Sequence, residues 1–348
     1  MVVTERAPAA AASPPSAAAR TFRAGGLVVG LALLALVFLL SIWVGSKSIP
    51  FTSTWSVLWH NDGSTEAVII HDLRIPRTLL GVVVGVALGL AGAVMQALTR
   101  NPLADPGLLG VNTGASAAVV SGIAFVGVTG VLGYIWFAFA GAAIASIVVY
   151  VLGSAGRSAT PDRLVLAGSA VMAVLQAYIV GILLLMPETF NQFRFWNVGS
   201  LSGRKWDVFW QISPFVAVGA VIALLLARPL NILALGDQTG KALGAHIGRT
   251  RVLGAIVVTL LCGAGTAAIG PVLFLGLAVP HAARMLVGPD QRWVLPYSML
   301  LAPIALIGAD VVGRVLNPPE ELQAGIVVAF LGAPVFIALC RRRKLARL

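Results

Sequence analysis

Charged residues are scarce in this chain of 348 residues, where they make up 11% of the sequence against 58% for hydrophobic residues. A soluble globular domain carries about 25% charged residues, so the composition excludes an ordinary soluble domain. Long apolar runs separated by short polar segments are typical of a protein that crosses a membrane several times. The sequence therefore predicts an all-α polytopic membrane protein.

Cysteine and histidine are also rare, with two and four residues respectively. Cys262 and Cys340 lie in or at the end of apolar runs, which supports neither a disulfide framework nor a metal cluster. A membrane-embedded enzyme needs a convergent set of histidine, cysteine or acidic side chains within the bilayer. The histidines at positions 60, 71, 246 and 281 do not supply one. We therefore predict no catalytic, cofactor-binding or metal-binding residues.

Acidic side chains are almost missing from the apolar runs. This argues against a transporter driven by an ion gradient, because such proteins usually carry buried carboxylates for the coupling ion. Asp310 is the exception. An acid within a membrane span is a functional candidate, but Arg314 follows one helical turn later. An ion pair at i,i+4 on one helix is the simpler explanation.

A nucleotide-binding loop is missing as well. The segment 236–241 has one residue too few between its glycines, continues with Ala242 where serine or threonine is needed, and follows no buried strand. If the protein pumps a substrate, a partner must therefore hydrolyse the ATP. The polar segment 228–251 contains a short amphipathic piece, and it is the natural surface for that partner.

Ten apolar runs account for residues 27–340, which we interpret as one transmembrane domain. They lie at 27–44, 77–98, 108–127, 131–153, 164–186, 208–227, 252–270, 272–287, 294–313 and 323–340. Segment 1–26, rich in alanine, proline and serine, predicts a disordered basic tail. Segment 341–348 predicts a second basic tail.

The basic residues predict the orientation of the chain. If ten spans alternate from an N-terminus inside the cell, most of the 24 basic residues fall on the cytoplasmic side, as the positive-inside rule requires. Both termini are then cytoplasmic. The net charge of +11 is spread between the runs and not clustered on one soluble module, so we predict no nucleic-acid partner.

The second apolar run carries four glycines on one helix face: Gly81, Gly85, Gly89 and Gly92. In lipid such a face lets a neighbouring helix approach closely, so we expect these glycines to serve helix packing. The run is followed by segment 101–107, whose two prolines predict a defined turn at a membrane face. That turn is either an ordinary connection or the lip of a pathway.

The loop 186–207 is rich in aromatic side chains, namely Phe190, Phe193, Phe195, Trp196 and Trp206. Aromatic residues gather at membrane–water interfaces, so an interfacial belt explains them. Contact with a substrate is the alternative.

Six segments in this order carry a family resemblance: LRIPRTL at 73–79, GAVMQALTRNPLADPGLLGVNTGA at 92–115, LNILALGDQTGKALG at 230–244, GLAVPHAARMLVGPD at 276–290, ADVVGR at 309–314 and GAPVF at 332–336. Through them the chain resembles the permease subunits of bacterial type II ABC importers for iron–siderophores, haem and cobalamin, over essentially everything after Leu27. The runs FRFWNVGSL at 193–201 and GPDQRW at 288–293 look more like the ferric-siderophore branch, catecholate-type in particular, than the cobalamin branch.

The resemblance implies a fold of about ten transmembrane helices and a second permease subunit, with a paralogous heterodimer favoured over a homodimer. Two cytoplasmic ATPase subunits, which bind the ATP and magnesium, would dock on segment 230–248. The residues implied for this coupling are Leu235, Gly236, Asp237, Leu243 and Gly244.

An extracytoplasmic siderophore-binding protein would dock on the opposite side. There Arg74 and Arg314 match arginines that pair with acidic residues of such a protein in relatives. Asn101 and Leu103, together with Thr160 and Pro161, match the segments that close the cytoplasmic mouth.

One departure concerns the last helix, where relatives often carry Glu-Leu-Pro and this chain has Gln323 in place of the proline.

The expected function is therefore that of a membrane subunit in the bacterial cytoplasmic membrane. It would move a ferric siderophore by alternating access, driven by ATP hydrolysis in its partners. Haem and cobalamin are alternative substrates within the same family, and an ion-gradient-driven secondary transporter is the alternative from a different class.

Overall fold

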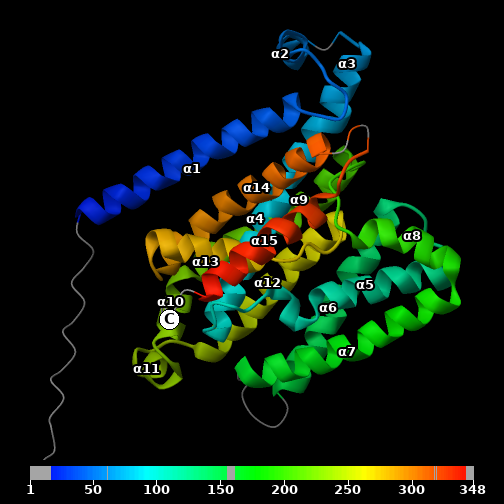
Figure 1. The fold of residues 1–348 in the computed structure, drawn as a ribbon. Coiled ribbons are helices and arrows are strands. Elements are labelled where there is room, and N and C mark those ends of the chain that lie inside the picture. The colour runs from blue at the N-terminus through cyan, green and yellow to red at the C-terminus, as the bar shows by residue number, and fades with distance from the viewer. Residues whose placement is uncertain (1–16, 61, 155–160, 317, 319, 342–348) are drawn as a thin grey trace, which may run out of the picture.

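The computed structural model describes residues 17–60, 62–154, 161–316, 318 and 320–341, and every regular element among them is a helix (Figure 1). This confirms the predicted all-α class. Segments 1–16 and 342–348, which hold most of the two predicted basic tails, lie outside the described residues.

Ten helices follow the ten predicted apolar runs in order. They are α1 (Ala17–Trp43), α4 (Ile75–Thr99), α5 (Val111–Ser121), α6 (Val131–Ser154), α7 (Pro161–Leu185), α9 (Trp206–Leu225), α12 (Ile247–Ile269), α13 (Leu275–Val287), α14 (Gln291–Leu316) and α15 (Ala324–Arg341). In the described part of the chain, 7 helices are long and apolar enough to cross a membrane. The helical segments that contain α5, α13 and α15 are also apolar but shorter.

Shorter helices lie in the connections, several of them in loops to which the sequence assigned no helix. They are α2 (Phe51–Trp59), α3 (Thr65–Val68), the π-helix η1 (Ile69–Arg74), the 3₁₀-helix η2 (Pro106–Leu109), the π-helix η3 (Gly122–Val126), α8 (Pro187–Asn197), α10 (Ala227–Ala234) and α11 (Asp237–Ala242).

Helix α1 begins earlier than predicted. Residues 17–26 were expected to belong to a disordered tail, but they form the first turns of α1, so the prediction of disorder is wrong for them. Three alanines at 17–19 favour the helical state. The Tyr297 hydroxyl also donates a hydrogen bond of 2.7 Å to the carbonyl of Arg23, which holds this end of α1 to α14.

Helix α13 begins three residues later than the predicted run at 272. Gly270 ends α12 with a φ of 86°, and Phe274 lies in the left-handed region with a φ of 66°. The 13 residues of α13 rise about 20 Å, which is less than the hydrocarbon core of about 30 Å. In the irregular stretch before α13, Gly270 and Val272 are buried, whereas the Leu273 side chain is exposed.

The bundle has two ends, which we call proximal and distal. The proximal end carries the start of α1, the end of α15 and the short helices α10 and α11 (Figure 1). The distal end carries the end of α1 and the helices α2, α3 and α8 (Figure 1).

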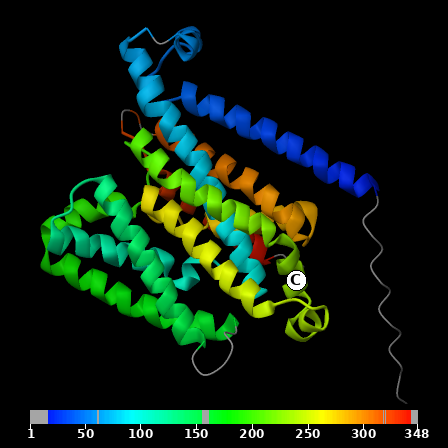
Figure 2. The ribbon, with the colours of Figure 1, turned by 180° about the vertical axis from the view of Figure 1, so that it is seen from behind.

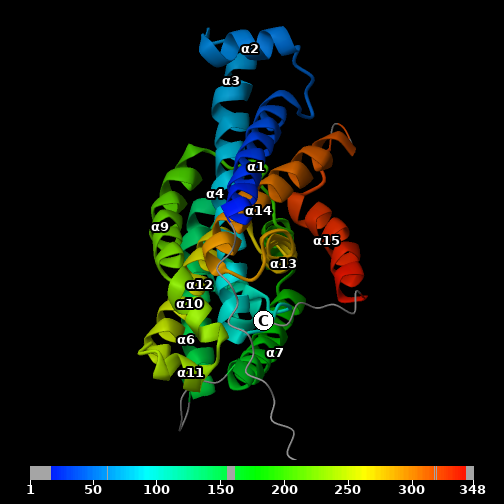
Figure 3. The same cartoon turned by 90° about the vertical axis from the view of Figure 1, so that its left-hand side faces the viewer.

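Helix α4 runs through the centre of the bundle, where it packs against α14, α12, α13 and α9. Leu80, Val84, Ala87 and Leu90 of this helix are completely buried. Figure 3 shows α9 and α15 on opposite sides of the central helices. A second group, formed by α5, α6 and α7, lies beside this centre (Figure 2) and joins it through α12.

The glycine face of α4 is in contact with two other helices. Gly81, Gly85 and Gly89 face α14, and Gly92 faces α13. A β-carbon at Gly85 would lie 2.5 Å from the α-carbon of Pro303, and one at Gly92 would overlap the backbone of Gly276. Backbone atoms cannot move aside as a flexible side chain can, so these crossings require glycine.

Candidate functional site

A helical hairpin projects at the proximal end, formed by α10 and α11 within the predicted coupling segment. Gly236 and Gly244 bracket α11 with φ angles of 98° and 78°, which favour glycine. Leu235 and Leu243 expose 59% and 61% of their surfaces. Large exposed apolar side chains ringed by polar residues mark candidate docking surfaces for another protein.

Asp237 holds this hairpin to the bundle. Both of its carboxylate oxygens accept hydrogen bonds of 2.9 Å from Nη2 of the buried Arg251, at the start of α12. Oδ1 of Asp237 also lies 3.7 Å from Nη2 of Arg100, at the end of α4. Asp237 therefore connects the hairpin to the ends of two central helices, α12 and α4.

A second attachment joins α10 to the turn before α14. Asn231 donates a hydrogen bond of 2.6 Å to Asp290 and accepts one of 2.8 Å from the backbone N–H of Gln291. Burial raises the pKa of Asp290, but hydrogen bonds from Arg292 and Asn231 outweigh it and hold that pKa below its ordinary value. Asp290 therefore stays ionised, which favours the bond.

The proline-containing segment after α4 is a well-defined turn. Arg100 caps α4 in the left-handed conformation with a φ of 51°. The side chain of Asn101 accepts a hydrogen bond of 2.9 Å from the N–H of Leu103, and Asp105 accepts one of 2.7 Å from the N–H of Gly107. These Asx turns fix the segment directly beside the Arg100–Asp237 contact.

The other predicted gate residues are placed only in part. Thr160 lies outside the described residues, and Pro161 is the first residue of α7. The gate that these two residues form with Asn101 and Leu103 stays a prediction.

A buried polar contact joins α4 to α13. The amide nitrogen of Gln96 donates a hydrogen bond of 3.0 Å to the carbonyl of Leu277, and its oxygen accepts one from Arg284. Nδ1 of His281 is buried and has no hydrogen-bond partner in the described part of the chain. Among the described residues no three histidine, cysteine or acidic side chains gather as metal ligands would.

Arg74 and Arg314 both lie at the distal end, where they bind carbonyls of the last turn of α1 and of the connection that follows it. Arg74 donates hydrogen bonds of 2.9, 2.6 and 2.6 Å to the carbonyls of Ile42, Trp43 and Lys47. Arg314 donates bonds of 2.7 and 3.1 Å to those of Ser41 and Val44. A helix leaves its last carbonyls unpaired and its C-terminus negative, so two cations are well placed there.

These two guanidinium groups are hardly accessible. Arg74 is 5% exposed and Arg314 is 2% exposed. Both were expected to contact a docking protein, and the structure gives both internal partners. Their role in docking stays a prediction, and a direct contact would require the distal surface to open.

Asp310 is the centre of an ion-pair network. It pairs with Arg314 one turn later, which confirms the pairing predicted from their spacing. Arg77 binds the same carboxylate through two bonds of 2.7 and 3.0 Å and also lies 2.6 Å from Glu321. Burial raises the pKa of Glu321, but the Arg77 guanidinium outweighs it and brings that pKa below its ordinary value.

Two neighbouring cavities open beside this network. One, of about 340 Å³, is lined by Ser46, Arg77, Ser200, Ser202, Glu321, Leu322 and Gln323. The other, of about 280 Å³, is lined by Val131, Tyr134, Gln192, Phe195, Trp196, Ser200, Ser202, Arg204 and Gln323, and we call it the Arg204 pocket.

Comparison with known protein families decides what this bundle is. Residues 33–342, nearly the whole chain, match the FecCD transport family. The chain belongs to the FecCD transport family.

Individual relatives agree with this assignment. The ferric enterobactin transport system permease protein FepD of Escherichia coli (strain K12) is 47% identical over 314 residues, which cover 90% of this chain and 94% of FepD. The Fe(3+)-citrate import system permease protein YfmD of Bacillus subtilis (strain 168) is 40% identical and covers 90% of this chain and 93% of its own.

A solved structure described as an inward-facing conformation of a metal-chelate type ABC transporter matches with a TM-score of 0.82 and 26% identity. The match covers 91% of this chain and 99% of that one. This FecCD chain is therefore the membrane-spanning, non-catalytic permease subunit of an ABC importer, which works with ATPase and binding-protein partners.

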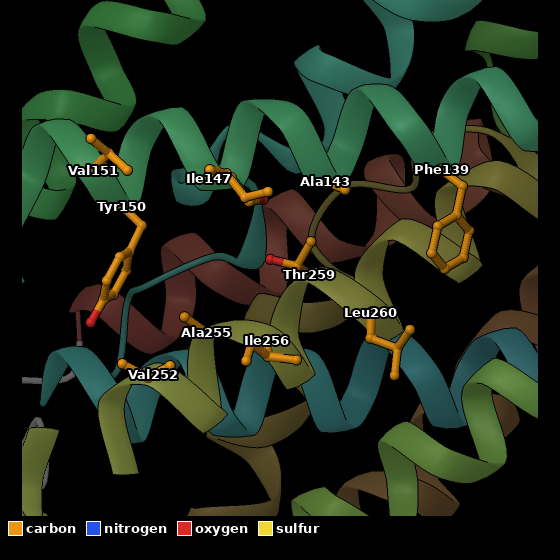
Figure 4. A pocket seen from close by; sticks show the side chains of 11 residues that line it. Phe139, Ala143, Ile147, Tyr150, Val151, Val252, Ala255, Ile256, Thr259 and Leu260 are labelled. Carbon is orange, nitrogen blue, oxygen red and sulfur yellow. The ribbon is translucent and has the colours of Figure 1, made fainter. Parts of the chain in front are cut away.

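The FecCD permease also has an apolar groove between α6 and α12, with a cavity of about 320 Å³ (Figure 4). Phe139, Ile147 and Tyr150 of α6 face Val252 and Ile256 of α12 across it. Its lining carries hydroxyl groups but no charge, so it is suited to packing and not to holding an ionic substrate.

Sequence reasoning missed Arg77, Glu321 and Arg204 as members of the distal sites. Arg77 is separated from Asp310 by 233 residues, so no local pattern announces their pairing. The helix α8 beside the Arg204 pocket could have been predicted, because a proline and an acidic residue are typical of the first turn of a helix, and Pro187 and Glu188 lie in that turn.

Proposed function

We propose that this permease moves a ferric siderophore, of the catecholate type, across the bacterial cytoplasmic membrane by alternating access. The observation that carries the proposal is the 47% identity to FepD over nearly the full length of both chains, since FepD belongs to a ferric enterobactin transport system. In this proposal the chelate enters at the distal end and leaves at the proximal end.

The proximal end faces the cytoplasm in this proposal, with both termini on that side. Exposed cations at the proximal end support this orientation, because the cytoplasmic loops of membrane proteins carry an excess of lysine and arginine. They include Arg228, Lys241 and Arg249.

The two ATPase subunits dock on the hairpin of α10 and α11. Leu235 and Leu243 supply apolar contact, and the turns at Gly236 and Gly244 present them. Asp237 passes the movement to Arg251 and Arg100, at distances of 2.9 and 3.7 Å.

Closure of the ATPases displaces the hairpin, and the ends of α4 and α12 move with it. The segment that follows Arg100 then moves as one unit, because its Asx turns are hydrogen-bonded internally. Asn101 and Leu103, with Thr160 and Pro161 across the mouth, form the cytoplasmic gate in this proposal.

A siderophore-binding protein docks at the distal end. Arg74 and Arg314 contribute by holding the end of α1, and with it the connection to α2, in the shape that the binding protein meets. Charge reversal at either site is expected to weaken docking and its stimulation of ATPase activity. Unchanged docking in a folded double variant would overturn the assignment.

The second permease subunit is a paralogue in this proposal, so the working pore is a heterodimer. Co-purification of the tagged chain with a different permease chain is expected. Recovery of two copies of this chain alone, in an assembly that transports, would contradict the heterodimer.

The proposed substrate is tested by uptake of radioactive iron in cells with and without this gene. Iron is supplied as a catecholate, a hydroxamate or a citrate chelate, with haem and cobalamin uptake measured in parallel. Loss of catecholate uptake alone, abolished also by ATP depletion, is the expected result. Normal uptake of all iron chelates with loss of haem or cobalamin uptake would overturn the siderophore assignment.

A further inference from the structure

Arg204 differs from the other buried arginines at the distal end. It is 7% exposed and lies in the connection between α8 and α9. Among the described residues, its Nε has no hydrogen-bond partner and no carboxylate forms an ion pair with it. Arg74, Arg77 and Arg314, in contrast, are bonded to carbonyls or carboxylates.

A buried cation without an anion is costly, because the protein does not replace the hydration that the charge has lost. Burial lowers the pKa of Arg204 to about 10, so the group still carries its charge at neutral pH. The described part of the chain therefore leaves a positive charge without a counter-ion at the wall of a cavity. An anionic ligand would neutralise it.

The Arg204 pocket adds aromatic surface to this charge. Tyr134, Phe195 and Trp196 line it together with Gln192 and Gln323. The indole N–H of Trp196 also lacks an acceptor among the described residues, although the side chain is buried. Arg204 and three aromatic side chains therefore line one space, and two N–H groups at its wall, Nε of Arg204 and Nε1 of Trp196, have no acceptor among the described residues.

The neighbouring cavity extends this space without adding positive charge. Ser200, Ser202 and Gln323 line both cavities, so the two are contiguous. Arg77 lies in the second cavity, but Asp310 and Glu321 neutralise it. Among the described residues that line the two cavities, Arg204 is therefore the cation without a carboxylate partner.

The backbone holds Arg204 in place before any ligand arrives. The N–H of Ser200 bonds to the carbonyl of Ile269 at 2.8 Å, and the N–H of Ser202 bonds to the Ser200 hydroxyl at 3.1 Å. Gly203 then turns the chain with a φ of 70°. A preorganised site loses little entropy on binding.

We propose that the Arg204 pocket binds one catecholate arm of an anionic ferric siderophore and selects for such chelates; this inference rests on the proposed function. The ring lies among the aromatic side chains, and its deprotonated oxygens lie against the Arg204 guanidinium. The pocket holds a single ring and not a whole chelate. A ferric tris-hydroxamate, which is neutral, would leave the cation unpaired and is disfavoured.

The test is equilibrium binding to the purified full-length permease in lipid nanodiscs, followed by quenching of tryptophan fluorescence. Three proteins are compared: wild type, Arg204→Gln, and the matched control Lys205→Gln, which removes an exposed cation one residue away. The probes are a ferric tris-catecholate and a neutral ferric tris-hydroxamate. Thermal unfolding midpoints are measured with and without each probe.

Arg204→Gln is expected to weaken binding of the catecholate at least about 30-fold, since losing one partner of a buried charge pair has an effect of that size. Lys205→Gln should bind as wild type does. Without ligand, Arg204→Gln should unfold at the same or a higher temperature, because an uncompensated charge has been removed. A purely structural arginine would instead lower the midpoint.

Equal binding by wild type and Arg204→Gln would overturn the site, as would equal affinity of wild type for both chelates. Either result leaves the proposed function standing if cells still lose catecholate uptake without the gene. Conversely, tight Arg204-dependent binding with normal uptake in cells that lack the gene would overturn the proposed function and leave the site intact. A Phe195→Leu variant provides a second check, with binding weakened roughly 3- to 10-fold by loss of ring contact.

Discussion

At the scale of single residues, the electrostatic surroundings of each arginine determine its role. Arg74 meets three carbonyls at the end of α1, and Arg77 meets two carboxylates. Arg204 meets no anion in the described part of the chain. The three side chains are chemically identical, so their different roles come from their partners. Arg74 caps a helix, Arg77 belongs to an ion-pair network, and Arg204 lines a candidate ligand site.

The glycines of α4 give a prediction at the same scale. Gly85→Ala would place a β-carbon 2.5 Å from the α-carbon of Pro303, so the two helices must separate. Overpacking of this kind costs about 1–3 kcal/mol. We expect a lower thermal midpoint for the purified protein in detergent.

Gly308→Ala on α14 is the matched control, because nothing lies within 4 Å of a β-carbon added there. It should leave the midpoint unchanged or raise it, since alanine favours a helix by about 1 kcal/mol over glycine. Equal midpoints for Gly85→Ala and wild type would show that α4 and α14 do not depend on this close approach.

At the scale of helices, the network around Asp310 connects α4, α14 and the segment before α15. Arg77 comes from α4, Asp310 and Arg314 come from α14, and Glu321 follows α14. Arg314 extends the connection to the end of α1. One carboxylate therefore neutralises charges from two helices and fixes their relative position at the distal end.

Asp310→Asn tests this connection. The change leaves Arg77 and Arg314 buried around an uncharged amide, and breaking a buried pair in this way costs about 3–5 kcal/mol. A large drop in the thermal midpoint and in the yield of monodisperse protein is expected. Asp207→Asn, at an exposed position in the first turn of α9, should behave as wild type. Equal stability of both variants would contradict the network's structural role.

Glu321 predicts a dependence of stability on pH. Its pKa is lowered in the folded protein, so its ionised form stabilises the fold at pH values above its ordinary pKa of about 4.3. That contribution is lost as the pH falls through the lowered pKa. Wild type should be more stable than Glu321→Gln at pH 7, by up to about 1 kcal/mol.

The difference between these two proteins should shrink below about pH 4, as Glu321 becomes protonated in wild type. Thermal midpoints measured between neutral and acidic pH check this. A difference that stays constant, or grows toward acid, would contradict the contact between Glu321 and Arg77.

At the scale of the whole molecule, the carboxylate of Asp237 joins the α11 part of the proximal hairpin to the ends of α4 and α12. Asp237→Asn keeps the size of the side chain but removes its charge. Hydrogen bonds between charged groups contribute about 1.5–3 kcal/mol, so uptake is expected to fall at least about tenfold. Association with the ATPase subunits should persist, because Leu235 and Leu243 remain.

Iron uptake and co-purification of the ATPase subunits are the two measurements. Asp162→Asn, at an exposed position in the first turn of α7, is the matched control and should affect neither. Full uptake in Asp237→Asn would remove this residue from the coupling path. Loss of ATPase association would assign it to docking instead.

The order and approximate bounds of the ten membrane helices could be predicted from the sequence, because hydrophobic length is a local property. The face shared by Gly81, Gly85, Gly89 and Gly92 could be predicted for the same reason, since helical periodicity places them together. The start of α1 could not be predicted from the sequence, because its first turns are held by a contact with Tyr297 on α14, which is distant in the chain.

By itself, the sequence determined a helical membrane bundle of the FecCD family, its span order, the pairing of Asp310 with Arg314, and the absence of a nucleotide loop. The spans, the ion pair and the missing loop follow from residues near one another in the chain, and the family follows from six segments read in order. Only the tertiary structure decided that Arg74 and Arg314 are buried, that Arg77 joins Asp310 and that Arg204 meets no anion among the described residues. The physical reason is that the free energy of a buried charge depends on every neighbouring dipole and carboxylate, and folding brings those neighbours from segments far apart in the sequence.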